Sequence, residues 1–191
     1  MDESPPLSPP SPTSPTERPP IAYDLLLSRR SIRRYEDRLV PDELVTRLLE
    51  AAMAAPSASN EQPWHFVVIS RRELLDELSE RHPYAGMLRE APLCIVPCGD
   101  LDLVPEGVSG EYWVQDVAAA TQNLLLAATA LGLGTVWCGV HPRPERVDMV
   151  REVLGIPSRI VPLCLVPVGY PAEQKPPRTQ FDPARVHRDG W

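Results

Sequence analysis

The chain has 191 residues, of which 43% are hydrophobic, and it carries a formal net charge of -7. This length is enough for one domain with one hydrophobic core, and the acidic balance argues against nucleic acid as the main partner. The four cysteines lack the closely paired spacing of a zinc site, so buried free thiols and no metal centre are expected. The first residues do not combine a basic start with an apolar run, and no apolar run reaches the roughly 18 residues of a membrane helix. A cytoplasmic protein that does not enter a membrane is therefore expected.

The first 20 residues differ in composition from the rest of the chain. They hold eight of the 24 prolines, with serine and threonine between them. Such a segment cannot bury enough apolar surface to offset the entropy lost on ordering it. The composition predicts a disordered arm over residues 1–20, either passive or a proline-rich ligand for a partner, and a folded domain over residues 21–191.

An arginine-rich stretch follows the first predicted helix, which spans Ile21–Ser28. The stretch reads Arg29-Arg30-Ser31-Ile32-Arg33-Arg34. Four arginines in six positions are typical of a solvated surface. The same guanidinium groups beside a serine hydroxyl also match a phosphate monoester, so the segment is a candidate phosphate site.

The next elements are a helix, a polar loop and a strand. Pro41 opens the helix, whose apolar residues recur at helical spacing, and Pro56 ends it. The loop Pro56–Pro63 is rich in amide and hydroxyl groups, and Trp64–Ile69 leaves it as a strand. Its side chains suit either turn chemistry or hydrogen bonds to a heterocycle.

The middle of the chain contains a helix after Ser70, a loop over His82–Met87 and a buried strand over Leu93–Cys98. His82 either faces a substrate or is simply exposed in this loop. A long helix is predicted from Ser109 to the glycines at 132 and 134, and it is apolar on several sides, which indicates burial on several sides. The strand Thr135–Val140 follows, and its Gly139 lets the backbone approach a ligand closely.

The last part of the chain contains a helix over Pro144–Leu154, closed by Gly155, and a strand over Val161–Tyr170. The prolines at 162 and 167 indicate a sheet edge or bulges in that strand. The tail from Pro171 to Trp191 has few apolar residues but ends on a tryptophan. Such a tail is expected to dock on another surface.

Residues 21–191 resemble the nitroreductase family of flavin-dependent oxidoreductases. The resemblance rests on stretches that occur in the family's order: Arg29–Arg33, Ala55–Trp64, Gly132–Gly139, and Gly169–Pro171 with the closing Val186-His187 and Trp191. It implies an α+β fold with three layers, helix, sheet and helix, and a mostly antiparallel sheet. It also implies an intertwined homodimer with two FMN sites at the interface.

The resemblance assigns the cofactor-binding residues. Arg29, Ser31 and Arg33, joined by Arg178 and Lys175, would hold the FMN phosphate, and Arg30 belongs to the same cluster. Pro56, Ser57 and Asn60 would come from the partner subunit, with Gln62 nearby. Trp137, Cys138 and Gly139 would line the flavin ring, with a backbone amide facing N5. Arg89 is a candidate for balancing the charge of the reduced ring.

The resemblance also implies the reaction. FMN would carry hydride from NAD(P)H to an electrophilic small molecule, such as a nitroaromatic or a quinone, by a ping-pong mechanism. No catalytic side chain is expected, because the flavin accepts the hydride and solvent supplies protons. The alternatives are a flavin-binding or flavin-carrying protein without turnover, and an enzyme of the same fold that dehalogenates substrates or fragments flavin.

Overall fold

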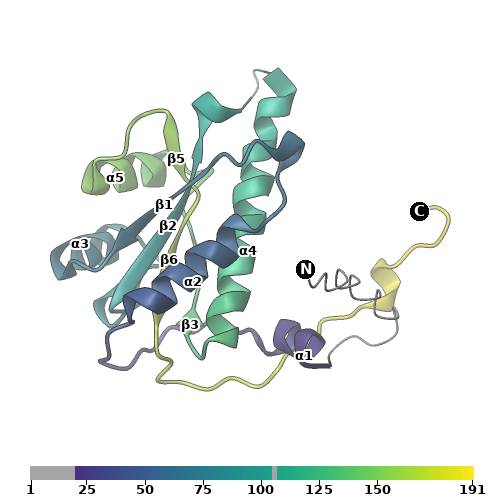
Figure 1. Cartoon of the computed structure of the whole chain (residues 1–191), viewed down its shortest axis with the longest axis horizontal. Coiled ribbons are helices and arrows are strands. Elements are labelled where there is room, and N and C mark those ends of the chain that lie inside the picture. The colour runs from purple at the N-terminus through teal and green to yellow at the C-terminus, as the bar shows by residue number, and fades with distance from the viewer. Residues whose placement is uncertain (1–19, 105–106) are drawn as a thin grey trace, which may run out of the picture.

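The computed structural model describes residues 20–104 and 107–191, which form an α+β domain (Figure 1). The predicted N-terminal arm lies outside these residues, except for Pro20, with which α1 begins. The helices are α1 (Pro20–Ser28), α2 (Asp42–Met53), α3 (Arg72–Arg81), α4 (Trp113–Ala130) and α5 (Pro144–Leu154). The strands are β1 (Trp64–Ile69), β2 (Leu93–Asp100), β3 (Gly134–Thr135), β4 (Cys138–Gly139), β5 (Ile160–Pro162) and β6 (Cys164–Gly169).

The strands form an antiparallel sheet. Its order is β1-β2-β6-β3, with β5 paired to β2 and β4 paired to β6. Strands β2 and β6 are buried along their whole length, whereas β1 is buried only at its two ends. The continuous apolar runs of β2 and β6 fit this position, because both of their faces are covered.

Helices cover both faces of the sheet. In Figure 1, α2 and α4 lie on one side of it, and α3 and α5 lie on the other. Each helix turns its apolar side inward: Leu48 of α2, Leu78 of α3, Leu124 of α4 and Val150 of α5 are fully buried. The predicted three-layer arrangement with a mostly antiparallel sheet is confirmed.

The central helix starts later than predicted and is covered by its own chain. A short 3-10 segment, Gly107–Tyr112, precedes α4, which begins at Trp113 rather than near Ser109. Gly99 of β2 makes this start possible, because a Cβ there would lie 2.3 Å from the Trp113 ring. Leu124 and Ala128 are both completely buried within the single chain. The many apolar sides of α4 therefore do not by themselves require a second copy.

Two predicted strands are interrupted in the structure. The predicted strand Thr135–Val140 forms β3 and β4 instead, separated by Val136 and Trp137. The pairs Thr135–Val168 and Cys138–Leu165 keep one register with β6, so Pro167 lies opposite Val136. Since proline has no N–H to donate, it interrupts the ladder there. The predicted strand Val161–Tyr170 likewise forms β5 and β6, on either side of Leu163.

The remaining features agree with the sequence. Helix α5 ends at Gly155, which has the left-handed backbone (φ 65°) that closes many helices. All four cysteines are free and buried. Among the helices of the described ranges, none combines the length and the apolarity needed to cross a membrane.

Candidate functional site

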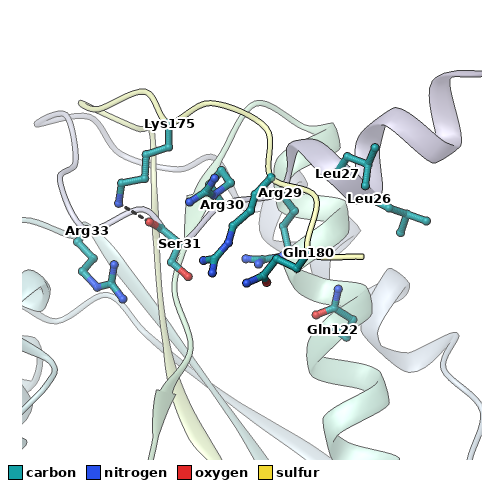
Figure 2. Close-up of a pocket in the computed structure, with 10 residues that line it drawn as sticks. Leu26, Leu27, Arg29, Arg30, Ser31, Arg33, Gln122, Lys175 and Gln180 are labelled. Atoms are coloured by element: carbon teal, nitrogen blue, oxygen red, sulfur yellow. Dashed lines mark hydrogen bonds between the residues drawn. The ribbon is translucent and has the colours of Figure 1, made fainter. Parts of the chain in front are cut away.

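A cavity of about 520 Å³ lies where the segment after α1 meets the C-terminal tail and α4. It is lined by the predicted phosphate residues and their neighbours: Leu26, Leu27, Arg29, Arg30, Ser31, Arg33, Gln122, Lys175, Arg178 and Gln180. Figure 2 shows these side chains around one space, on segments that are far apart in sequence. Arg29, Arg30, Ser31, Arg33, Lys175 and Arg178 are thus brought together as the sequence predicts.

The charge of this cavity is strongly one-sided. Five of its lining residues are cationic and none is acidic, although the chain as a whole carries a net charge of -7. Like charges gathered at one place repel one another, and an anion bound between them would offset this repulsion. Guanidinium forks and a serine hydroxyl are suitable donors for the oxygens of a phosphate monoester.

The backbone of the arginine segment is fixed on both sides. Ser31 forms a bridge with Thr135 of β3, and the Ile32 N–H donates to the Thr135 carbonyl at 2.9 Å. On the other side, Lys175 Nζ donates to the Ser31 carbonyl at 2.6 Å, a bond drawn in Figure 2. The Arg33 N–H donates to Glu173 at 2.5 Å, and this bond holds the pKa of that carboxyl below its usual range. The tail is therefore attached to the segment that carries the arginines.

A second cavity, of about 480 Å³, adjoins the sheet at β4. It is lined by Arg33, Tyr84, Gly86, Met87, Val136, Trp137, Cys138 and Gly139. The three predicted ring-binding residues, Trp137, Cys138 and Gly139, are all among them. Arg33 lines both cavities, so a single ligand with an anionic end and a flat end could contact both through this residue.

The backbone of the second cavity leaves room for a flat group. A Cβ added at Gly139 would meet no atom within 4 Å, and this glycine does not have a positive φ. The Trp137 side chain beside it is 37% exposed. Neither internal packing nor backbone geometry requires a glycine here, and the open space beside it is wide enough for a flat group to approach the backbone.

Cys138 is buried and chemically quiet in this wall. Burial raises the pKa of its thiol to about 11, and its Sγ lies 3.4 Å from the Tyr84 carbonyl. A thiol with such a pKa is a poor nucleophile at neutral pH. Cys138 therefore lines the cavity without acting as a nucleophile, which agrees with its apolar neighbours in the sequence.

His82 is buried, not exposed or directed at a substrate as the sequence suggested. Only 1% of its surface is exposed, and its ring contacts Gly139, which lies 57 residues further along the chain. Such a contact leaves no local signal in the sequence. Several cavity residues were missed for the same reason: Leu26, Leu27, Tyr84, Met87 and Gln180. Gln122 also lines the first cavity, and it did have a signal in the sequence, because it interrupts the apolar pattern of α4.

The loop that carries Pro56, Ser57, Asn60 and Gln62 lines neither cavity within one chain. It lies at the Trp113 end of α4 (Figure 1), where the Ala58 N–H donates to Asp116 at 2.9 Å. Asn60 and Gln62 have positive φ angles of 59° and 50°. Residues other than glycine adopt this backbone rarely, and its cost is often associated with a functional site.

Arg89 lies away from both cavities described above. It lines a separate cleft of about 570 Å³ together with Arg34, Tyr35, Arg72 and Glu90. Arg33 is the arginine that lines the Trp137–Gly139 cavity, so it replaces Arg89 as the candidate for balancing charge at the ring.

The residues present fit FMN. The cationic cavity suits its phosphate, and the adjoining cavity, with open space over Gly139, suits its ring. Fold and site together define an α+β protein built to bind a phosphate group beside a flat one. The chain belongs to the nitroreductase family, whose model matches residues 26–82 and 76–170.

Individual relatives agree with this assignment. The chain is 48% identical over 168 residues to a Methanothermobacter thermautotrophicus protein provisionally named NADH dehydrogenase/NAD(P)H nitroreductase, covering 88% of this chain and 86% of the relative. A crystal structure from Parabacteroides distasonis, provisionally given the same name, matches with a TM-score of 0.85 at 41% identity, covering 90% of this chain and 99% of the other. A provisionally named nitroreductase from Desulfovibrio desulfuricans, crystallised in complex with FMN, matches with a TM-score of 0.75 at 31% identity. The match covers 92% of this chain and 99% of the other.

Proposed function

We propose that this protein is an FMN-dependent oxidoreductase that passes electrons from NAD(P)H to an electrophilic small molecule. The observation that carries the proposal is a pair of cavities that share Arg33 in their linings, one cationic and one bordered by open backbone at Gly139. Family membership and the FMN complex of a relative support it.

The cationic cavity would hold the phosphate of FMN. Arg29, Arg30, Arg33 and Arg178 present guanidinium groups to it, and Ser31 presents a hydroxyl. Lys175 adds positive charge while it also holds the Ser31 carbonyl and Glu173. Hydrogen bonds to charged groups contribute about 1.5–3 kcal/mol each, so this end supplies much of the affinity.

The second cavity would hold the ring. Gly139 lets it lie against the backbone, Trp137 and Cys138 border it, and Arg33 places a positive charge at its edge. The chemistry supplied by bound FMN would be two-electron hydride transfer from NAD(P)H to the acceptor, and the two substrates would use the same face in turn. Within the described residues, no carboxylate or imidazole lines this cavity, so protons would come from solvent.

The second subunit would complete each site. We propose a homodimer in which the partner supplies the equivalents of Pro56, Ser57, Asn60 and Gln62, because the loop carrying them lines neither cavity of its own chain. The tail supports this arrangement, since it carries exposed apolar side chains such as Phe181 and Trp191.

Steady-state kinetics with added FMN test the reaction. We expect oxidation of NADPH or NADH in the presence of a quinone or nitroaromatic, with parallel double-reciprocal lines at several acceptor concentrations. Intersecting lines would mean that both substrates bind together and would contradict the shared face. FMN binding without turnover over a panel that includes halogenated phenols would instead favour a flavin-binding protein.

A further inference from the structure

His82 joins the two walls of the second cavity. It follows α3, and its Nε2 lies 3.0 Å from the carbonyl oxygen of Gly139 in β4. Its Nδ1 lies 3.2 Å from the N–H of Tyr84 on the opposite wall. A carbonyl can only accept a hydrogen bond and an N–H can only donate one, so Nε2 carries the proton and Nδ1 does not. The contacts define a neutral imidazole.

Other contacts connect the same walls. Arg146 of α5 donates through Nη1 to the Gly139 carbonyl at 3.0 Å, and its guanidinium lies 5.2 Å from the centre of the Tyr84 ring. The Cys138 thiol contacts the Tyr84 carbonyl. Both segments line the same cavity, Met87 from one and Trp137 from the other. Of these links, only His82 bonds to the backbone of both walls with one side chain.

We propose that His82 is a positioning residue, whose neutral imidazole sets the separation and orientation of the Tyr84–Met87 and Val136–Gly139 walls around the flavin ring. Its protonation would place an N–H against the Tyr84 N–H and separate the walls. FMN binding therefore weakens in acid through a group that does not touch the flavin phosphate. This inference rests on the proposed function.

The charges around His82 favour the neutral form. Burial lowers its pKa, and although the bond to Gly139 opposes that shift, the positive charge of Arg146 adds to it. The Tyr84 ring packs edge-on against the imidazole, with centroids 6.4 Å apart. On α3 the neighbouring Arg81 is paired with Glu77 and with Glu152 of α5. The pKa of His82 in the folded protein lies below its ordinary value of about 6.5. The neutral ring therefore stabilises the folded walls above that pH, and this contribution is lost as the pH falls through the folded pKa.

Two substitutions separate the proposal from a simple packing role. His82→Gln keeps a neutral donor near the position of Nε2 but cannot take up a proton, and His82→Phe keeps the ring volume without either hydrogen bond. His65→Gln is the matched control, because His65 is half exposed and lines neither cavity. The dissociation constant of FMN is measured for all four proteins by flavin fluorescence at pH 7.5 and pH 5.

We expect His82→Phe to bind FMN about tenfold more weakly at pH 7.5, with a shifted visible flavin spectrum, and His65→Gln to match the wild type. Between pH 7.5 and pH 5, the wild type should lose about threefold more affinity than His82→Gln. Titration of the FMN phosphate itself, with a pKa near 6, affects all four proteins equally. Equal acid sensitivity of wild type and His82→Gln would overturn the proposal, even if His82→Phe fails to fold.

A readout that needs no flavin completes the test. The ¹⁵N chemical shifts of the imidazole ring, assigned by their loss in His82→Gln, should report a neutral Nε2–H tautomer in the flavin-free protein at pH 6. A protonated ring there would overturn the proposal. A wild type that fails to bind FMN at all, with the expected tautomer, would instead refute the proposed function.

Discussion

Gly139 occupies a position where the protein itself has no need of glycine. Its φ is not positive, and nothing lies within 4 Å of the place a Cβ would take. Gly99 is the opposite case, since a Cβ there would collide with Trp113. The two positions thus need glycine for different reasons. Gly99 makes room for Trp113 within the fold, and we propose that Gly139 makes room for the flavin.

The pair gives a matched test. We expect Gly139→Ala to leave the free energy of unfolding within about 0.5 kcal/mol of wild type, because the methyl group enters open space. The same change should weaken FMN binding by about tenfold or more, because the ring lies where the methyl group would be. Gly99→Ala should instead lower stability by more than about 2 kcal/mol through overpacking. Thermal unfolding measures the stability of the two variants, and titration with FMN measures their affinity for the cofactor. Unchanged FMN affinity in Gly139→Ala would place the ring elsewhere.

The Pro56–Pro63 loop is held by α4. Asp116, buried in the first turn of that helix, accepts the Ala58 N–H, and the Ser57 hydroxyl accepts the Gln62 N–H at 3.0 Å. A loop with several positive φ angles needs such contacts to keep one conformation. Since we propose that this loop reaches the partner's flavin, its conformation should matter for cofactor binding.

Removing the contact tests that role. Asp116→Ala should speed amide hydrogen exchange over residues 57–62 and weaken FMN binding by about threefold to tenfold, since one charge-assisted hydrogen bond is lost. Asp116→Asn keeps an oxygen acceptor and should show a smaller effect on both. Faster exchange with no change in FMN affinity would show that the loop takes no part in the site.

The elements differ in how far the sequence predicts them. Helices α1 to α5 follow from apolar spacing and from signals such as Pro41 and Gly155, which act locally. The interruption between β3 and β4 depends on Pro167, about 30 residues away in the chain, and could not be predicted without the register. The burial of His82 depends in the same way on Gly139. Within the site, the arginine cluster was found from its composition, whereas Tyr84, Met87 and Gln180 could be found only from the fold.

The whole molecule has an unusually open C-terminal tail. In Figure 1 the tail passes α1, where the Arg178 N–H donates to the Leu27 carbonyl at 3.2 Å, and then runs away from the body. Phe181 is 80% exposed, and Trp191 is fully exposed except for its stacking on His187. Apolar side chains on an extended segment gain stability only when another surface covers them.

We therefore expect a dimer whose tails lie on the partner. Sedimentation velocity should give a dimer for the wild type and a markedly weaker one for Phe181→Ser combined with Trp191→Ser. Because both side chains are largely exposed within one chain and belong to no helix of the domain core, the double variant should keep its helical circular dichroism. Leu124 and Ala128 are unsuitable for this test, because they lie in the core of a single chain. A wild type that sediments as an FMN-loaded monomer would contradict the proposed assembly.

The central claim is that the arginine cavity holds the phosphate of FMN, and a comparison of FMN with riboflavin tests it most directly. Riboflavin has the same ring but no phosphate, so the wild type should bind FMN at least about 100-fold more tightly, equivalent to about 2.7 kcal/mol. Arg29→Gln combined with Arg178→Gln should remove most of that difference while leaving riboflavin affinity unchanged. Arg71→Gln, an exposed arginine that lines neither cavity, is the control. Equal affinities of the wild type for FMN and riboflavin would contradict the account.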